Sequence, residues 1–267
     1  MTETWMNPVK KKLQAGECVF ACTITANSAE VAAQAANCGF DFLWVETEHS
    51  PVTLDTLRNI VLATRGLPAV PFARVPVNEL WTAKRVLDAG VQGVIFPFTS
   101  TPELAQQAAA ACRYPPVGKR GSGAGLATFT WPTKDEYHDS ADKNIVVIAI
   151  MEEGRAVDRI DEIAATPGID VLFIGTSDLS FSLGHRGKQD HPEVKAAIAK
   201  IVAAGKKHGK FLGRPAATAE QFREYRELGF QLFQAKTDIG FMTAGARQFL
   251  AEVGREVEKP KTASPLY

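Results

Sequence analysis

The chain has 267 residues, of which 30 are basic and 30 acidic, and its formal net charge is zero. This length suits a single α/β barrel domain of about 250 residues, and the balanced charge, with no basic block or acidic tail, gives no sign of nucleic-acid binding. No apolar run reaches the roughly 18 residues of a membrane span, and the N-terminus has no signal-peptide pattern, so we expect a cytoplasmic protein.

Strands and helices alternate through the first 112 residues. Apolar β-branched runs predict strands, and apolar residues at helical spacing predict helices between them. The predicted strands are 18–25, 41–46, 69–75 and 93–97, and the predicted helices are 7–14, 29–37, 53–64, 79–89 and 102–112. Ser28 and Thr101 are expected to cap the helices that follow them.

Residues 113–144 interrupt the alternation with paired prolines, the run KRGSGAG and a polar stretch. A segment of this length without clear elements is expected to be a functional loop or an arm that contacts another subunit. The tail, 255–267, contains two prolines and little apolar sequence, so we expect it to fray or to dock on a partner subunit.

The alternation resumes after residue 144. The predicted strands are 145–151, 170–174, 210–213 and 232–235, and the predicted helices are 155–165, a short helix after 174, 191–207, 219–228 and 239–253. Eight strands alternating with helices predict one (β/α)8 barrel domain over 1–267. An open doubly wound sheet is the alternative, but no G-x-G-x-x-G follows the first strand.

The four cysteines are scattered and lack the paired spacing of metal ligands. They are Cys18, Cys22, Cys38 and Cys112. We expect small free thiols in a reducing compartment, because neither a disulfide framework nor a zinc motif fits this spacing.

Charged residues gather where the predicted strands end, which is where barrel enzymes assemble their sites. They are Glu46, Glu48, His49, Arg74, Glu152, Asp178, Arg214 and Lys236. Glu152 and Asp178 follow neighbouring parallel strands, so they are expected to lie together and to bind a hard divalent cation. Acids that merely stabilise helix N-termini are an equally good interpretation of this spacing alone.

The motifs favour the first interpretation. In residues 145–184, Glu152 is followed after 25 residues by D-L-S, and the segment ends in I-G-T-S-D-L-S-F-S-L-G. These motifs, together with E-T-E-H-S at 46–50, resemble those of the HpcH/HpaI aldolase family of metal-dependent pyruvate aldolases. The resemblance extends from about residue 16 to residue 250. The resemblance implies a lyase that reversibly cleaves a 4-hydroxy-2-oxo acid into pyruvate, or a related 2-oxo acid, and an aldehyde.

The resemblance also implies roles for individual residues. Glu152 and Asp178 would hold Mg²⁺, Mn²⁺ or Co²⁺, which would act as a Lewis acid on the 2-oxo acid. Arg74 would contact the keto or enolate oxygen. His49, oriented by Asp88 within the chain or across a subunit boundary, would take the proton of the C4 hydroxyl.

The backbone N–H groups of Gly175, Thr176 and Ser177 are expected to hold the substrate carboxylate. Lys236 stands where the family commonly has a small residue, so we expect it to narrow the mouth. It would attract an acidic aldehyde there unless Asp238 neutralises it.

Two other functions are compatible with the sequence. One rival is a Schiff-base aldolase that uses Lys236, and the other is a non-catalytic barrel that binds a small anion. The resemblance implies a homo-oligomer, commonly a hexamer built as a trimer of dimers, often with the last helices exchanged between subunits.

Overall fold

The computed structural model describes residues 5–131 and 137–255, which form a closed barrel of parallel strands in the order β1 to β8. The strands are β1 Val19–Ile24, β2 Phe42–Glu46, β3 Val70–Arg74, β4 Gly93–Phe96, β5 Val146–Met151, β6 Val171–Ile174, β7 Phe211–Pro215 and β8 Leu232–Thr237. The predicted (β/α)8 barrel is confirmed. The open-sheet alternative is wrong because β1 pairs in parallel with β8.

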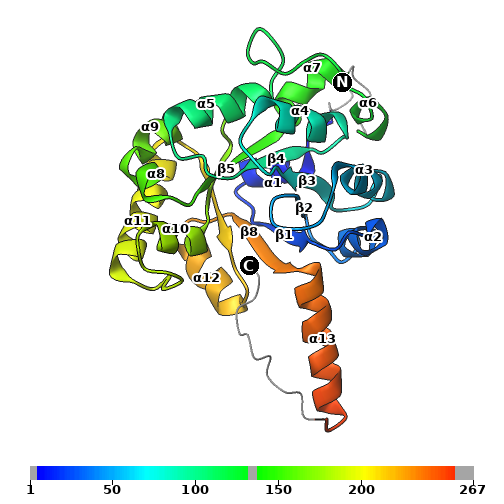
Figure 1. The fold of residues 1–267 in the computed structure, drawn as a ribbon, viewed down its shortest axis with the longest axis vertical. Helices are drawn as coiled ribbons and strands as arrows, with labels where there is room; N and C mark the ends of the chain where they lie inside the picture. The colour runs from blue at the N-terminus through cyan, green and yellow to red at the C-terminus, as the bar shows by residue number, and fades with distance from the viewer. Residues whose placement is uncertain (1–4, 132–136, 256–267) are drawn as a thin grey trace.

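Helices surround the strands on the outside (Figure 1). They are α1 Pro8–Gln14, α2 Ala29–Ala36, α3 Leu54–Ala63, α4 Leu80–Asp88, α5 Pro102–Ala111, α6 Ala127–Thr130, α7 Tyr137–Asn144, α8 Gly154–Asp158, α9 Ile160–Ala165, α10 Thr176–Ser182, α11 Pro192–Lys207, α12 Ala219–Glu227 and α13 Asp238–Glu252. The expected caps are present, since Ser28 and Thr101 side chains accept backbone N–H bonds. The single helix predicted over 155–165 is instead two helices, broken at Arg159, whose ψ is 21°.

Alternation along each strand builds two apolar layers. The inward layer fills the barrel with aromatic and branched side chains, such as Phe42 against Phe72 at 4.7 Å and Trp44 against Phe173 at 4.8 Å between ring centroids. The outward layer packs against the helices. Because the barrel interior is full, polar chemistry is confined to the open ends.

The segment 113–144 is not the featureless loop expected from its composition, because it contains α6 and α7. Trp131 and Tyr137 are buried, and Trp131 donates from Nε1 to the Gly90 carbonyl at 3.0 Å. These two aromatic side chains hold the segment against the barrel. The many polar residues near them leave too few apolar residues at helical spacing to predict α6 and α7 from the sequence. Residues 132–136 and the tail from 256 onward lie outside the described residues, so the predicted fraying or docking of the tail stays a prediction.

The four cysteines are free thiols, as expected. Burial raises the pKa of Cys22 and of Cys112 to about 12, so both behave as inert apolar groups. No helix in the described part of the chain is both long and apolar enough to cross a bilayer. The cytoplasmic location stays a prediction.

Candidate active site

The C-terminal mouth of the barrel carries a layer of charged side chains directly above the aromatic interior. Glu46 follows the inward Trp44 by two residues, Arg74 follows Phe72, and Glu152 follows Ile150. The period of two therefore points these side chains toward the barrel axis. Glu46 and Arg74 are partners in the β2–β3 register, which places them side by side.

Arg74 is buried between two carboxylates. Its Nε lies 2.7 Å from Glu46 Oε2 and 3.2 Å from Glu48 Oε2, and only 6% of its side chain is exposed. Glu46 is 1% exposed, and its Oε1 also accepts the N–H groups of Glu48 and His49 at 2.8 and 3.0 Å. Glu46 therefore holds both the guanidinium and the turn that follows β2. A buried arginine is expected to need such partners.

Glu48 faces the same mouth and is short of hydrogen-bond donors. Its Oε2 is buried and accepts no hydrogen bond in the described part of the chain, although Arg74 Nε is close. Burial, aided by the charges of Glu46 and Asp178 and opposed by Arg74, raises the pKa of Glu48 to about 7. A cation bound beside Glu48 would compensate the negative charge of this buried carboxylate.

Glu152 is the most enclosed of the three acids Glu48, Glu152 and Asp178, at 2% exposed. Its Oε1 accepts the N–H of Phe98 at 2.6 Å, and Phe98 adopts a φ of 46°, which is uncommon for a residue other than glycine. Burial raises the pKa of Glu152 to about 7, and the nearby charges of Asp178 and Glu48 act in the same direction. The neighbouring Glu153 points elsewhere, since it accepts a bond from Arg155 Nε at 2.8 Å.

Asp178 completes the acid cluster from the first turn of α10, where it is partly exposed. Gly175 precedes this helix, and a Cβ there would come within 2.9 Å of Glu152 Oε2, so glycine leaves room for the carboxylate. Glu48, Glu152 and Asp178 together outnumber the positive charge of Arg74. Carboxylate oxygens are the ligands that a hard divalent cation prefers. The ligand atoms of these three acids do not all lie within 4.8 Å of one another, so water would complete the shell of a cation held here.

The expected anion-binding N–H groups require one correction. The N–H of Gly175 donates to the Met151 carbonyl at 3.2 Å, so the expectation that it binds a carboxylate is wrong: it continues the sheet ladder. Thr176 and Ser177 are the first residues of α10, and N–H groups at such positions have no acceptor within the helix. Thr176 Oγ1 is engaged with Gln189 Oε1 at 2.7 Å.

The structure separates His49 from Asp88 within one chain. His49 lies at the mouth after β2, its side chain is 43% exposed, and its Nε2 is 3.7 Å from Glu48 Oε1. Asp88 is the last residue of α4 and therefore lies at the other end of the barrel, where the strands begin. Its Oδ1 accepts a bond from Arg120 Nη2 at 3.0 Å. Pairing of His49 with Asp88 within one chain is therefore ruled out by topology.

The two other basic residues at strand ends, Arg214 and Lys236, lie in different surroundings. Arg214 faces the helix layer and not the mouth, with its guanidinium 3.3 Å from the ring centroid of Tyr225. Lys236 is exposed at the end of β8. Asp238 forms no ion pair with Lys236 in the described chain; its carboxylate accepts bonds from the Thr25 hydroxyl and N–H, the Ala26 N–H and the Ile239 N–H.

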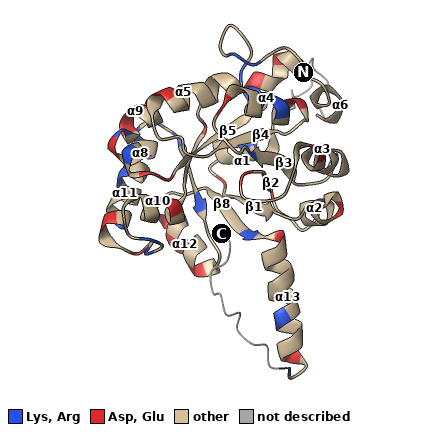
Figure 2. Cartoon of the chain, in the orientation of Figure 1, with Lys and Arg blue, Asp and Glu red and all other residues tan. Residues whose placement is uncertain are grey.

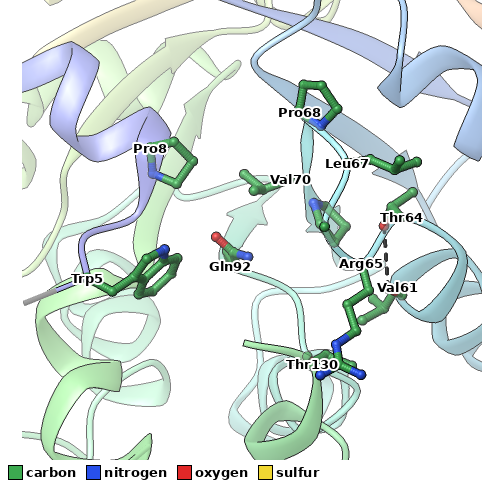
Figure 3. Close-up of a pocket in the computed structure, with 13 residues that line it drawn as sticks. Trp5, Pro8, Val61, Thr64, Arg65, Leu67, Pro68, Val70, Gln92 and Thr130 are labelled. Atoms are coloured by element: carbon green, nitrogen blue, oxygen red, sulfur yellow. Dashed lines mark hydrogen bonds between the residues drawn. The ribbon is translucent and has the colours of Figure 1, made fainter. Parts of the chain in front are cut away.

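A cavity of about 200 Å³ lies at the opposite end of the barrel, where β3 and β4 begin (Figure 3). Trp5 and Pro8 face Leu67 and Pro68 across it, and Gln92 projects between them. None of the predicted site residues lines this cavity. The acid cluster at the mouth is therefore the candidate active site.

Comparison with known proteins identifies the family of this chain. Residues 20–243 match the model of the HpcH/HpaI aldolase/citrate lyase family. The chain belongs to this family. It is 34% identical to a hydroxypyruvate/pyruvate aldolase of Paraburkholderia phytofirmans over 256 residues, which are 94% of this chain and 98% of the relative. It is 38% identical to a 5-keto-4-deoxy-D-glucarate aldolase of Salmonella arizonae over 210 residues, covering 79% and 82%.

A solved family structure from Burkholderia cenocepacia J2315 superposes with a TM-score of 0.87 at 35% identity, covering 94% of this chain and all of that one. These matches confirm the predicted family and the prediction of an aldolase-type lyase, so the non-catalytic barrel is not retained. Class II aldolases of the HpcH/HpaI family generally use a divalent metal ion.

The sequence gives no specific role to some residues of this candidate site. Glu46 and Glu48 were recognised only as charged residues at a strand end, yet they hold Arg74. Their E-x-E spacing carries a signal, because residues at i and i+2 along an extended segment point the same way. The Phe98 N–H, which orients Glu152, carries no such signal, because a backbone donor is independent of residue type.

Proposed function

We propose that this chain is a metal-dependent aldolase that reversibly cleaves a 4-hydroxy-2-oxo acid into pyruvate, or a related 2-oxo acid, and an aldehyde. The observation that carries the proposal is the convergence of Glu48, Glu152 and Asp178 on one mouth beside Arg74. The names of the relatives, which include an aldolase of pyruvate and an aldolase of a keto-deoxy sugar acid, support the class of substrate.

Glu152 and Asp178 would hold the cation. Their oxygen ligands suit Mg²⁺ or Mn²⁺ and also admit Co²⁺. When bound, a divalent cation supplies Lewis acidity for the negative charge that develops on the 2-oxo acid during C–C cleavage. The Phe98 N–H bond fixes the orientation of Glu152 before the cation arrives.

Arg74 would stabilise the same developing charge. Glu46 holds its Nε at 2.7 Å, so the guanidinium is preorganised and need not reorient during the reaction. Burial of the pair strengthens its electrostatic effect. The N–H groups of Thr176 and Ser177 would receive the substrate carboxylate at the N-terminus of α10.

His49 would take the proton from the C4 hydroxyl during cleavage and return it during synthesis. Its exposure at the mouth keeps it accessible to the aldehyde half of the substrate. If Asp88 orients this histidine, the aspartate must come from a partner subunit, because the same chain carries it at the far end of the barrel.

A homo-oligomer, of which a hexamer is the expected form, is the second part of the proposal. Helix α13 projects away from the barrel (Figure 1), and Figure 2 shows few charged residues on it. Among its residues only Asp238 is buried. Its exposed apolar side chains are Ile239, Phe241, Met242 and Phe249. A projecting helix with so much apolar surface is best explained by packing against another subunit.

Lys236 would set the preference for the aldehyde. Since Asp238 is engaged with Thr25, Ala26 and Ile239, the ammonium remains available to an acidic group on the substrate. The Schiff-base mechanism would instead require this amine to attack the keto carbon, for which lysines are usually desolvated. The exposure of Lys236 favours the metal mechanism.

The experiment that tests the function is a screen of pyruvate against an aldehyde panel, with Mg²⁺ or Mn²⁺ and with EDTA. Metal-dependent formation of a 4-hydroxy-2-oxo acid is the expected result. Full turnover in EDTA, together with borohydride trapping of pyruvate on Lys236, would favour the Schiff-base alternative.

A further inference from the structure

A group of side chains that could ligate a metal ion lies outside the candidate active site. His185 is in the connection that follows α10, His191 is the N-cap of α11, and Glu193 is in the first turn of that helix. The three side chains each offer a ligand atom, and these atoms all lie within 4.8 Å of one another. No other trio of histidine, cysteine or acid within 5–131 and 137–255 meets this condition.

The group contains a second imidazole ring in contact with a histidine–glutamate pair. His185 Nε2 lies 2.7 Å from Glu193 Oε2, and the rings of His185 and His191 stack with centroids 3.5 Å apart. A divalent cation uses both imidazoles in their neutral form and the carboxylate in its charged form.

We infer that His185, His191 and Glu193 form a second cation site, for Zn²⁺ or a similar late first-row metal. Two histidines and one glutamate are a known three-ligand set for zinc, with the fourth position left to water. Imidazole favours Zn²⁺, Ni²⁺ and Cu²⁺ over Mg²⁺, in contrast to the all-oxygen site at the mouth. This inference does not rest on the proposed aldolase reaction.

Zn–N distances of about 2.0–2.1 Å require the three ligand atoms to draw together and the stacked rings to rotate. The side chains have the freedom to do so. His185 is 20% exposed and Glu193 is 68% exposed. His191 Nδ1 accepts the N–H of Glu193 at 3.3 Å as the helix cap. Binding a metal through Nε2 would shift the ring proton to Nδ1 and give up this long hydrogen bond.

A metal here would join two elements that support the aldolase mouth. The connection that holds His185 also contains Gly187, whose N–H donates to Ser180 Oγ at 2.9 Å, and Gln189, which contacts Thr176. Both contacts fix α10, the helix that carries Asp178. Bound Zn²⁺ would tie this connection to the start of α11 and stabilise the folded protein by mass action.

The test separates the two sites by removing the first. Untagged Glu152→Gln/Asp178→Asn protein, freed of metal and checked by circular dichroism, is titrated with Zn²⁺ against a chromophoric chelator. We expect one equivalent to bind, with an affinity that excess Mg²⁺ does not change. Adding His185→Gln or His191→Gln should weaken Zn²⁺ binding at least about tenfold, because losing a direct ligand should cost no less than the roughly 10–100-fold that follows loss of an outer-shell partner.

His208→Gln is the matched control. His208 also faces a carboxylate, with Nε2 2.9 Å from Asp161 Oδ1, but it belongs to no three-ligand group in the described chain. This substitution should leave Zn²⁺ affinity unchanged. A cobalt-substituted sample of the same protein should show nitrogen-ligand absorption that His185→Gln abolishes.

Two results would overturn the inference. One is the absence of stoichiometric Zn²⁺ binding in the folded double variant, and the other is an equal loss with His208→Gln and His185→Gln. Should the double variant not fold, the wild-type protein saturated with Mg²⁺ serves instead. It should take up one equivalent of Zn²⁺ that His185→Gln removes, and failure to do so contradicts the site.

Discussion

Replacing Glu152 with glutamine should stabilise the metal-free protein while removing its affinity for the cation. Burial together with the charges of Asp178 and Glu48 raises the pKa of Glu152 from 4.5 to about 7. At about 1.36 kcal/mol per pKa unit, ionising this buried carboxyl at pH 8 costs about 3 kcal/mol more in the folded protein than in the unfolded chain. A glutamine side chain at this position keeps an oxygen acceptor for the Phe98 N–H and carries no charge.

The sign of the pH dependence follows from the raised pKa. Below the ordinary value of 4.5 the carboxyl is protonated in both states and no penalty exists. The penalty grows as pH rises and is complete above about pH 7. Metal-free wild-type protein should therefore lose stability between about pH 5 and pH 8, and the Glu152→Gln variant should lose less. At pH 8 the variant should melt several degrees higher, given roughly 2–4 °C per kcal/mol for a chain of this size.

Calorimetry at pH 5 and pH 8, with EDTA and with saturating Mg²⁺, measures both effects. Mg²⁺ should stabilise the wild-type protein by mass action and leave the variant unchanged, so the order of melting temperatures should reverse. A matched Glu153→Gln variant, altered at the outward-facing neighbour, should show neither effect. A metal-free Glu152→Gln protein that melts below wild type at pH 8 would refute the account of crowded carboxylates.

Three further outcomes are expected. Arg74→Lys should fold but lose most activity in steady-state assays, because an ammonium cannot reproduce the bonds of the guanidinium to Glu46 and to substrate; near wild-type turnover would remove Arg74 from the mechanism. Lys236→Ala should raise KM for an acidic aldehyde and spare small neutral acceptors, and an equal loss with every acceptor would contradict the role in specificity. Light scattering at micromolar concentration should give a multiple of 28.9 kDa; the mass of one chain would contradict assembly through α13.

Much of the fold was predictable because hydrophobic periodicity repeats regularly along this chain. The eight strands and their order at the mouth follow from that period, and with them the convergence of Glu152 and Asp178. The helix caps at Ser28 and Thr101 were predictable for a local reason, since a short polar side chain satisfies nearby N–H groups.

The parts that escaped prediction depend on tertiary contacts. The helices within 113–144 are anchored by Trp131 and Tyr137, and Trp131 bonds to Gly90, which is far away in sequence. The pairing of Asp88 with Arg120 likewise needs the segment to fold back on α4. The surroundings of Asp238 do not follow from its spacing to Lys236, because its carboxylate accepts bonds from Thr25 and Ala26, which are near the opposite end of the chain.

The most direct test of the central claim is exchange of the pyruvate methyl protons in D₂O, followed by NMR without any aldehyde. Wild-type protein should catalyse exchange with Mg²⁺ or Mn²⁺, because the cation and Arg74 stabilise the enolate whichever aldehyde is natural. EDTA or Asp178→Asn should abolish it, while Lys236→Ala should retain it. Exchange that persists in EDTA and disappears in Lys236→Ala would contradict the metal-dependent mechanism.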